Sequence, residues 1–220
     1  MIDSPIWQAV WLTTKLATFS TLLLFVLALP LAWWLSQTRC YLRPVVDAVI
    51  TLPLILPPTV LGFYLLVLFS PKHPVGGLWF SIFDSPLVFS FYGLLIASAI
   101  YSLPFVVQPI RDAFRKIDKD LLDVSRTMGA SKGQIFRFVI FPLSKQGITT
   151  GCILGFAHTI GEFGVVLLIG GNIPGETRVL SIALYDLIET MQMELANQVA
   201  AGLLGFSFLV LLLVSYLQRR

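Results

Sequence analysis

The stretch DVSRTMGASKGQIFRFVIFP, from Asp123 to Pro142, is a charged, glycine-containing segment inside an otherwise strongly apolar chain. Hydrophobic residues make up 56% of the 220 residues and charged residues only 12%, whereas soluble domains average about 45–50% and about 25%. This composition indicates an integral membrane protein. A membrane protein that keeps such a segment presents it to water, where a soluble partner can contact it.

Five apolar stretches flank this segment, and each is long enough to cross a bilayer, which takes roughly 20 helical residues. They cover approximately residues 10–35, 45–69, 87–110, 148–169 and 199–217. Unbroken apolar runs of this length are typical of helices rather than of the alternating strands of a membrane barrel. We therefore predict an all-α integral membrane protein, a single domain over residues 1–220 with a bundle of five transmembrane helices and a polar connection at 111–147.

The basic residues predict the orientation. All but three of the 15 Lys and Arg residues lie in the turn before the second span, in the connection 111–147 or in the C-terminal tail with Arg219 and Arg220. The positive-inside rule makes the connection and the C-terminus cytoplasmic, and five spans then put the N-terminus in the periplasm. No basic region precedes the first span, so we expect no cleaved signal peptide. The net charge of +3 reflects this topology, and we expect no nucleic-acid partner.

The polar connection has a helical pattern at its start. Apolar residues recur at spacings of three and four at Phe114, Ile117, Leu121, Val124 and Met128, which places them on one helical face. Gly129 and Gly133 then predict a break, and Pro142 a kink or a new helix start. We expect a short helix, a glycine turn and a second helix that returns to the membrane. Periodicity alone favours an interfacial amphipathic helix in a solvated loop.

The segment resembles the EAA loop of ATP-binding-cassette importer permeases, whose pattern is Glu-Ala-Ala, three residues, Gly, nine residues and Ile-x-Leu-Pro. Asp123, Val124 and Ser125 stand at the first three positions, Gly129 matches, and Val139, Phe141 and Pro142 close the pattern. The resemblance implies a type I importer permease fold. It also implies a set of residues that couple to a separate ATPase subunit: Asp123, Val124, Ser125, Arg126, Gly129 and Ala130.

The chain carries no G-x-x-x-x-G-K-[ST] phosphate loop, so we expect it to be a transport subunit and not an enzyme. The resemblance implies that ATP and Mg²⁺ bind to the partner ATPase, and we expect no metal or cofactor on this chain. The expected partners are a second copy of the chain, two ATPase subunits, a periplasmic protein that binds the cargo, and membrane lipid.

Two further segments indicate the cargo. LPLILPPTVLGFYLLVL (52–68) and GEFGVVLLIGGNIPGETRVLSIALYD (161–186) resemble the permease subunits of molybdate importers. The GNIPGET sequence favours them over the related sulfate and thiosulfate permeases, which come second. The resemblance implies import of molybdate, or of the similar oxyanion tungstate, across the bacterial inner membrane. It also implies that the periplasmic partner is a molybdate-binding protein. The residues also allow two less favoured functions, an ATP-independent secondary transporter and a membrane enzyme that uses His158 and Glu162.

Residues in the second and fourth spans are candidates for the pathway or for helix packing. Pro57 and Pro58 free backbone carbonyls and bend the helix, as a gate or as a static kink. Gly155 forms a small-x-x-x-small pair with Gly151, which predicts close packing near a dimer axis. His158 and Glu162 are four residues apart and are expected on one face, towards an interior or a cavity.

The outer connections are expected to meet the binding protein. The turn-forming segment after the fourth span supplies the docking candidates Asn172, Pro174, Gly175 and Glu176. An amphipathic helix with a stripe from Leu180 to Leu195 is expected to follow it. The loop 70–86, rich in Pro and Gly, completes the expected docking surface.

Overall fold

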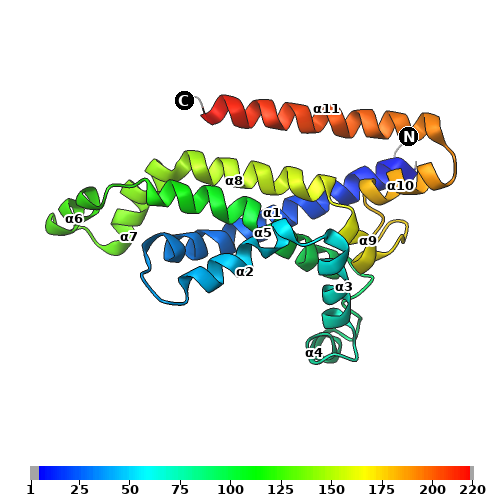
Figure 1. The fold of residues 1–220 in the computed structure, drawn as a ribbon, viewed down its shortest axis with the longest axis horizontal. Coiled ribbons are helices and arrows are strands. Elements are labelled where there is room, and N and C mark those ends of the chain that lie inside the picture. Colours follow the sequence, from blue (N-terminus) through cyan, green and yellow to red (C-terminus); the bar gives the residue numbers. More distant parts are fainter. Residues whose placement is uncertain (1–4, 219–220) are drawn as a thin grey trace.

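The structure, a computed structural model, describes residues 5–218, and Arg219 and Arg220 of the topology argument lie outside them. Four long helices run along its longest axis (Figure 1): α1 (Pro5–Gln37), α5 (Phe91–Arg115), α8 (Phe141–Gly161) and α11 (Met193–Gln218). The described residues contain no strand, so the all-helical prediction is confirmed. Within residues 5–218, three single helices are long and apolar enough to cross a membrane, and the number of spans rises to as many as five if each of two bent helix pairs counts as one span.

Helices α1, α5 and α8 form the packed centre because α8 carries small residues on the side that faces α5. A Cβ on Gly147 would lie 2.4 Å from the Cβ of Ala113, and one on Gly155 would lie 2.4 Å from a methyl of Val106. A Cβ on Gly151 would lie 2.8 Å from the carbonyl oxygen of Val106. The close helix packing predicted at Gly151 and Gly155 is therefore made with α5 of the same chain, and their position near a dimer axis stays a prediction.

Two predicted spans are each made of two helices. Residues 45–69 form α2 (Arg43–Ile55) and α3 (Pro58–Phe69), bent by 115° at Pro57, which cannot donate a backbone hydrogen bond. Residues 148–169 belong to α8 and to α9 (Gly164–Gly170), which are bent by 62°. Helices α3 and α9 then pack together, and a Cβ on Gly62 would lie 2.9 Å from the Leu168 side chain. The two helix breaks thus meet in space.

The outer segments differ from the expected loops. The connection 70–86 contains α4 (Pro74–Phe83), whose N-cap His73 accepts a hydrogen bond from the Val75 amide at 3.4 Å. Helix α10 (Leu180–Glu189) stops before the predicted stripe ends, because Met191 has a φ of 58° and separates α10 from α11. The expected single helix to Leu195 is therefore two helices.

The polar connection forms an elbow at one end of the molecule. It consists of α6 (Lys119–Thr127), α7 (Lys132–Ile135) and a π-helical turn, η1 (Phe136–Ile140), which leads directly into α8. In Figure 1 the elbow lies at the same end as the last residues of α11, and α10 lies at the opposite end with the start of α1.

The interior holds two apolar cores with a polar layer between them. One core joins α1, α5 and α8 near the elbow, and the other joins α1, α3, α5 and α9 near α10. Between them lie the buried hydroxyls of Ser20 on α1, Ser98 and Ser102 on α5 and Thr159 on α8, together with Glu162. Burying polar groups inside a membrane protein costs free energy. The layer therefore marks the region of the two helix breaks beside it as a candidate functional site.

Candidate functional site

The elbow has the predicted order of helix, glycine turn and helix. Asp118 caps α6 by accepting a hydrogen bond from the Asp120 amide at 3.0 Å. Gly129 ends α6 with a φ of 81°, a left-handed conformation that favours glycine. Ser131 and Gln134 then form a capping box that starts α7. Gly133 lies inside α7, so the prediction that it breaks the helix is wrong.

The predicted apolar face divides between two helices. Helix α5 ends at Arg115 and α6 begins at Lys119. Phe114, in the last turn of α5, and Ile117, between the two helices, are buried in the core. On α6 it is Leu122, a residue outside the predicted face, that is buried. Val124 is 54% exposed and Met128 is 82% exposed. Helix α6 therefore presents apolar side chains to the outside of the elbow, as a helix that contacts a partner would.

The predicted coupling residues share this short helix and the turn after it. Asp123 and Arg126 form an exposed ion pair of 2.6 Å on the surface of α6. The Ser125 carbonyl accepts a hydrogen bond from the Ala130 amide at 3.1 Å, which closes the turn around Gly129. The structure thus brings Asp123, Val124, Ser125, Arg126, Gly129 and Ala130 together in one continuous surface element.

The π-helical turn explains how the elbow continues into the membrane without a break. Pro142 has no backbone amide hydrogen, so it cannot complete the α-helical bond to the residue four before it. The preceding amide, that of Phe141, instead donates to the carbonyl of Phe136, five residues earlier. The expected kink or fresh start at Pro142 is therefore a widened turn within a continuous helix.

A membrane cavity of about 580 Å³ opens at the two helix breaks and is lined by Pro58, His158 and Glu162 among others. These three predicted pathway residues are brought together. Pro57 sits at the break but outside the lining, and Gly155 packs on α5 instead. No Lys or Arg is among the described residues that line the cavity.

His158 and Glu162 do not share one helical face, because α8 ends at Gly161 and Glu162 has an extended backbone. The Nδ1 atom of His158 lies 2.9 Å from the hydroxyl of Ser102, and its ring stacks on Phe105 with centroids 3.9 Å apart. Ser102 is also within 3.0 Å of the Thr159 hydroxyl. The histidine is thus held by α5, not by the carboxyl group.

Glu162 is the unusual group of the cavity wall. It is 3% exposed, and its carboxyl group interacts with the Ser98 hydroxyl without forming a hydrogen bond of regular geometry to any described residue. The backbone carbonyl of Glu162, in contrast, accepts a hydrogen bond from Ser181 of α10. The search of residues 5–218 finds no group of three or more metal-ligating side chains, so hydroxyl, imidazole, carboxyl and backbone groups are what the cavity offers a ligand.

The outer loop after α9 is built on one buried threonine. The Thr177 hydroxyl donates to the Gly170 carbonyl at 2.6 Å and accepts from the Ile173 amide at 3.2 Å. Asn172 donates to Asp186 of α10 at 3.1 Å. The predicted docking residues Asn172, Pro174, Gly175 and Glu176 are all exposed on this loop, and Gly175 has a φ of 79°.

Sequence reasoning missed two polar contacts that hold these regions. Arg178 lies against Asn172 and Asp186 and fixes the outer loop to α10. Arg111 of α5 forms an ion pair with Asp47 of α2, and its side chain is only 13% exposed. Ionisable residues in or near membrane spans usually have a charged or polar partner, so the sequence could have indicated that Arg178 and Arg111 are each paired. It does not identify which residue the partner is.

Comparison with known proteins shows the family to which this chain belongs. The family model described as a binding-protein-dependent transport system inner membrane component matches residues 25–220. The chain is 50% identical, over 92% of its length and 90% of the relative's, to the molybdenum transport system permease protein ModB of Azotobacter vinelandii. It is 31% identical to the sulfate transport system permease protein CysT of Escherichia coli, over 100% of this chain and 79% of the relative.

A solved structure supports the fold. The chain superimposes with a TM-score of 0.73 and 18% identity on a chain of a bacterial alginate ABC transporter in complex with an alginate pentasaccharide-bound periplasmic protein, covering 100% of this chain and 80% of that one. The predicted importer permease fold is confirmed, and the apolar helices fit a multi-pass protein of the inner membrane. The chain belongs to the family of inner membrane components of binding-protein-dependent transport systems.

Proposed function

We propose that this chain is the permease subunit of an ATP-driven importer that moves molybdate, or tungstate, across the bacterial inner membrane. The observation that carries the proposal is the 50% identity to a molybdenum transport permease over 92% of the chain. The relative named for sulfate transport is 31% identical, which makes sulfate or thiosulfate the second candidate cargo. Molybdate and tungstate are oxyanions of nearly the same size, shape and charge, so the proposal covers both.

The membrane cavity supports a role in passage rather than in tight binding. Its described lining has no Lys or Arg, and Glu162 lies in its wall, so a dianion would meet hydroxyl, imidazole and backbone groups instead of fixed cations. Selectivity then resides in a separate periplasmic binding protein. The exposed loop with Asn172, Pro174, Gly175 and Glu176 is the proposed contact for that protein.

The elbow is the proposed link to ATP hydrolysis. Residues Asp123–Ala130 would contact an ATPase subunit, which binds the ATP and Mg²⁺ that this chain has no phosphate loop to hold. Each chain has one elbow, so two copies related by a two-fold axis would engage two ATPase subunits and complete one pathway. The elbow and the C-terminus then face the cytoplasm and the N-terminus the periplasm.

The test is oxyanion-dependent ATPase activity in proteoliposomes that contain the chain, its ATPase and the cognate binding protein. Molybdate or tungstate is expected to stimulate hydrolysis, and sulfate is expected to have little effect. A larger stimulation by sulfate would contradict the cargo assignment. Oxyanion flux through the purified chain without the ATPase would contradict the ATP-driven mechanism and favour a secondary transporter.

A further inference from the structure

The inner side of the elbow contains a second cavity, which we call the elbow pocket. Its volume is about 320 Å³, and it lies between the end of α1 and the elbow helices, lined by Trp33, Gln37, Leu122, Arg126, Lys132, Ile135, Phe136 and Ile140. Of the proposed coupling residues, Arg126 is the one that also lines this pocket. The pocket shares no lining residue with the membrane cavity at the helix breaks.

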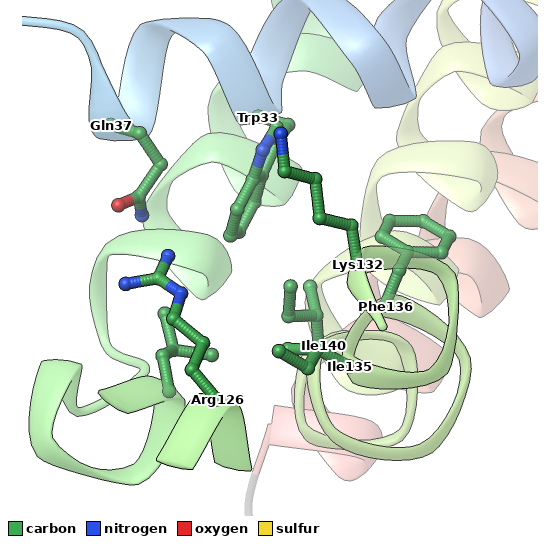
Figure 2. Close-up of a pocket in the computed structure, with 8 residues that line it drawn as sticks. Trp33, Gln37, Arg126, Lys132, Ile135, Phe136 and Ile140 are labelled. Atoms are coloured by element: carbon green, nitrogen blue, oxygen red, sulfur yellow. The ribbon is translucent and has the colours of Figure 1, made fainter. Parts of the chain in front are cut away.

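Two cationic side chains line this pocket. Figure 2 shows Arg126 and Lys132 extending towards the end of α1, where Trp33 and Gln37 point back at them. One guanidinium nitrogen of Arg126 is paired with Asp123 at 2.6 Å. Among the described residues, Lys132 has no carboxylate within ion-pair distance. One positive charge is thus left uncompensated, and the rest of the Arg126 fork is open to a second acceptor.

The other walls of the pocket are apolar. Leu122, Ile135 and Ile140 are buried members of the core near the elbow, and Trp33 packs edge-on against Phe114 with centroids 5.4 Å apart. Trp33 lies in the last turns of the long apolar helix α1, where tryptophan is typical of the level of lipid headgroups. The pocket thus combines cations and amide donors with an apolar floor at a membrane interface.

We propose that the elbow pocket binds a tetrahedral phosphate-type oxyanion, and that the phosphodiester group of an anionic phospholipid is the source that fits it best. Arg recognises such oxyanions through paired N–H donors and Lys through a point charge. A volume of about 320 Å³ equals about ten water volumes, which leaves room for a glycerol headgroup beside the phosphate. The apolar floor suits the start of an acyl chain.

Occupancy of the pocket would tie together elements that are far apart in the sequence. Trp33 and Gln37 belong to α1, Arg126 to α6 and Lys132 to α7. A bound phosphate would bridge the membrane-embedded helix and the elbow, and so brace the elbow against the bilayer. This proposal does not depend on the cargo of the transporter.

The test uses the full-length chain, delipidated in a neutral detergent and titrated with short-chain phosphatidylglycerol, phosphatidylcholine or inorganic phosphate, with bound ligands counted by native mass spectrometry. Phosphatidylglycerol is expected to bind more tightly than phosphatidylcholine. Arg126→Gln and Lys132→Gln should each weaken its binding about fivefold, since one basic residue near a membrane surface contributes about that factor. The matched control is Lys119→Gln, an exposed lysine of α6 outside the pocket, and it should leave binding unchanged.

Asp123→Asn provides a test of opposite sign, because it frees the guanidinium of Arg126 and should tighten binding. Inorganic phosphate that binds with the same dependence on Arg126 and Lys132 would identify a free oxyanion as the source, and binding of phosphatidylglycerol alone would identify the lipid. Equal binding of phosphatidylglycerol by the wild type and both Gln variants, or equal binding of the two lipids, would overturn the proposal.

Discussion

Replacing Gly129 by alanine tests whether the elbow depends on its left-handed turn. Gly129 has a φ of 81°, and a Cβ placed on it would meet no atom within 4 Å. The substitution therefore introduces no clash, and its whole effect comes from the backbone conformation. Gly133 is the matched control, because it lies four residues later in the same elbow, is helical, and also has open space around a Cβ.

The two substitutions have opposite expected signs. A left-handed residue with a Cβ costs about 1–2 kcal/mol, so Gly129→Ala should destabilise the elbow by that amount. Alanine is about 1 kcal/mol better than glycine inside a helix, so Gly133→Ala should stabilise α7. The stabilities of the elbow in the two variants should therefore differ by about 2–3 kcal/mol, although the chemical change is the same.

Amide hydrogen exchange of the full-length chain in lipid nanodiscs measures this difference locally. The Gly129 amide donates to the Arg126 carbonyl at 2.9 Å and the Ala130 amide to the Ser125 carbonyl at 3.1 Å, so both report on the turn. A loss of about 1–2 kcal/mol corresponds to a roughly 5–30-fold drop in protection. In the assembled transporter the same variant should lower cargo-stimulated ATP hydrolysis.

The prediction is refuted if Gly129→Ala and Gly133→Ala change the protection of the elbow in the same direction. If both variants lower protection in residues 119–131 equally, the effect is general to the elbow and not due to the φ of Gly129. If Gly129→Ala leaves protection and coupled hydrolysis unchanged, the left-handed turn is not required, and the geometry assigned to the coupling surface is wrong.

Three further substitutions test the packing. Gly147→Ala should lower the melting temperature in detergent, because its Cβ would lie 2.7 Å from the Pro109 carbonyl oxygen and overpacking costs about 1–3 kcal/mol. The control Gly202→Ala should leave the melting temperature unchanged, since a Cβ there would meet no atom within 4 Å. Asp47→Asn should destabilise the chain, because the largely buried Arg111 then keeps only its contact with the more exposed Asp112. A double-mutant cycle of denaturation with Arg111→Gln should show that the effects of the two substitutions are not additive. Thr177→Val should loosen the outer loop by about 1–3 kcal/mol, since it removes the partner of a buried carbonyl, and limited proteolysis should detect cleavage between residues 171 and 178.

The elbow could be predicted because its signals are local. Helical spacing and a glycine with a positive φ act within a few residues of one another, so the order of helix, turn and helix follows from the sequence. The predicted apolar face, which included Leu121, is wrong for a tertiary reason. The residues Lys116–Asp118 interrupt the helix, so the face that is buried on α5 is not continued on α6, where Leu122 and not Leu121 faces the core.

The two helix breaks were only half predictable. Pro57 has a local cause for its bend, since it lacks a donor. The break at Glu162 has no such signal, and the neighbouring glycines indicated close packing instead. A Cβ on Gly164 would lie 2.8 Å from the Cβ of Pro58, so the second break is shaped by contact with the first. Such a contact joins positions about a hundred residues apart and does not appear in local periodicity.

The membrane cavity lies beside the polar layer between the two cores, and Glu162 belongs to both. Helix breaks free backbone groups that hydrocarbon cannot satisfy, and nearby side chains supply partners, as Ser181 does for the Glu162 carbonyl. The Ser102 hydroxyl likewise lies within hydrogen-bond distance of His158 and Thr159. The Glu162 carboxyl departs from this pattern, as do the Ser20 and Ser98 hydroxyls of the same layer, since none of these groups forms a regular hydrogen bond to a described residue. A buried carboxyl without a regular hydrogen bond costs more free energy than a hydroxyl in the same position, and local rules are broken mainly at functional sites, so we propose that Glu162 serves the pathway rather than the core.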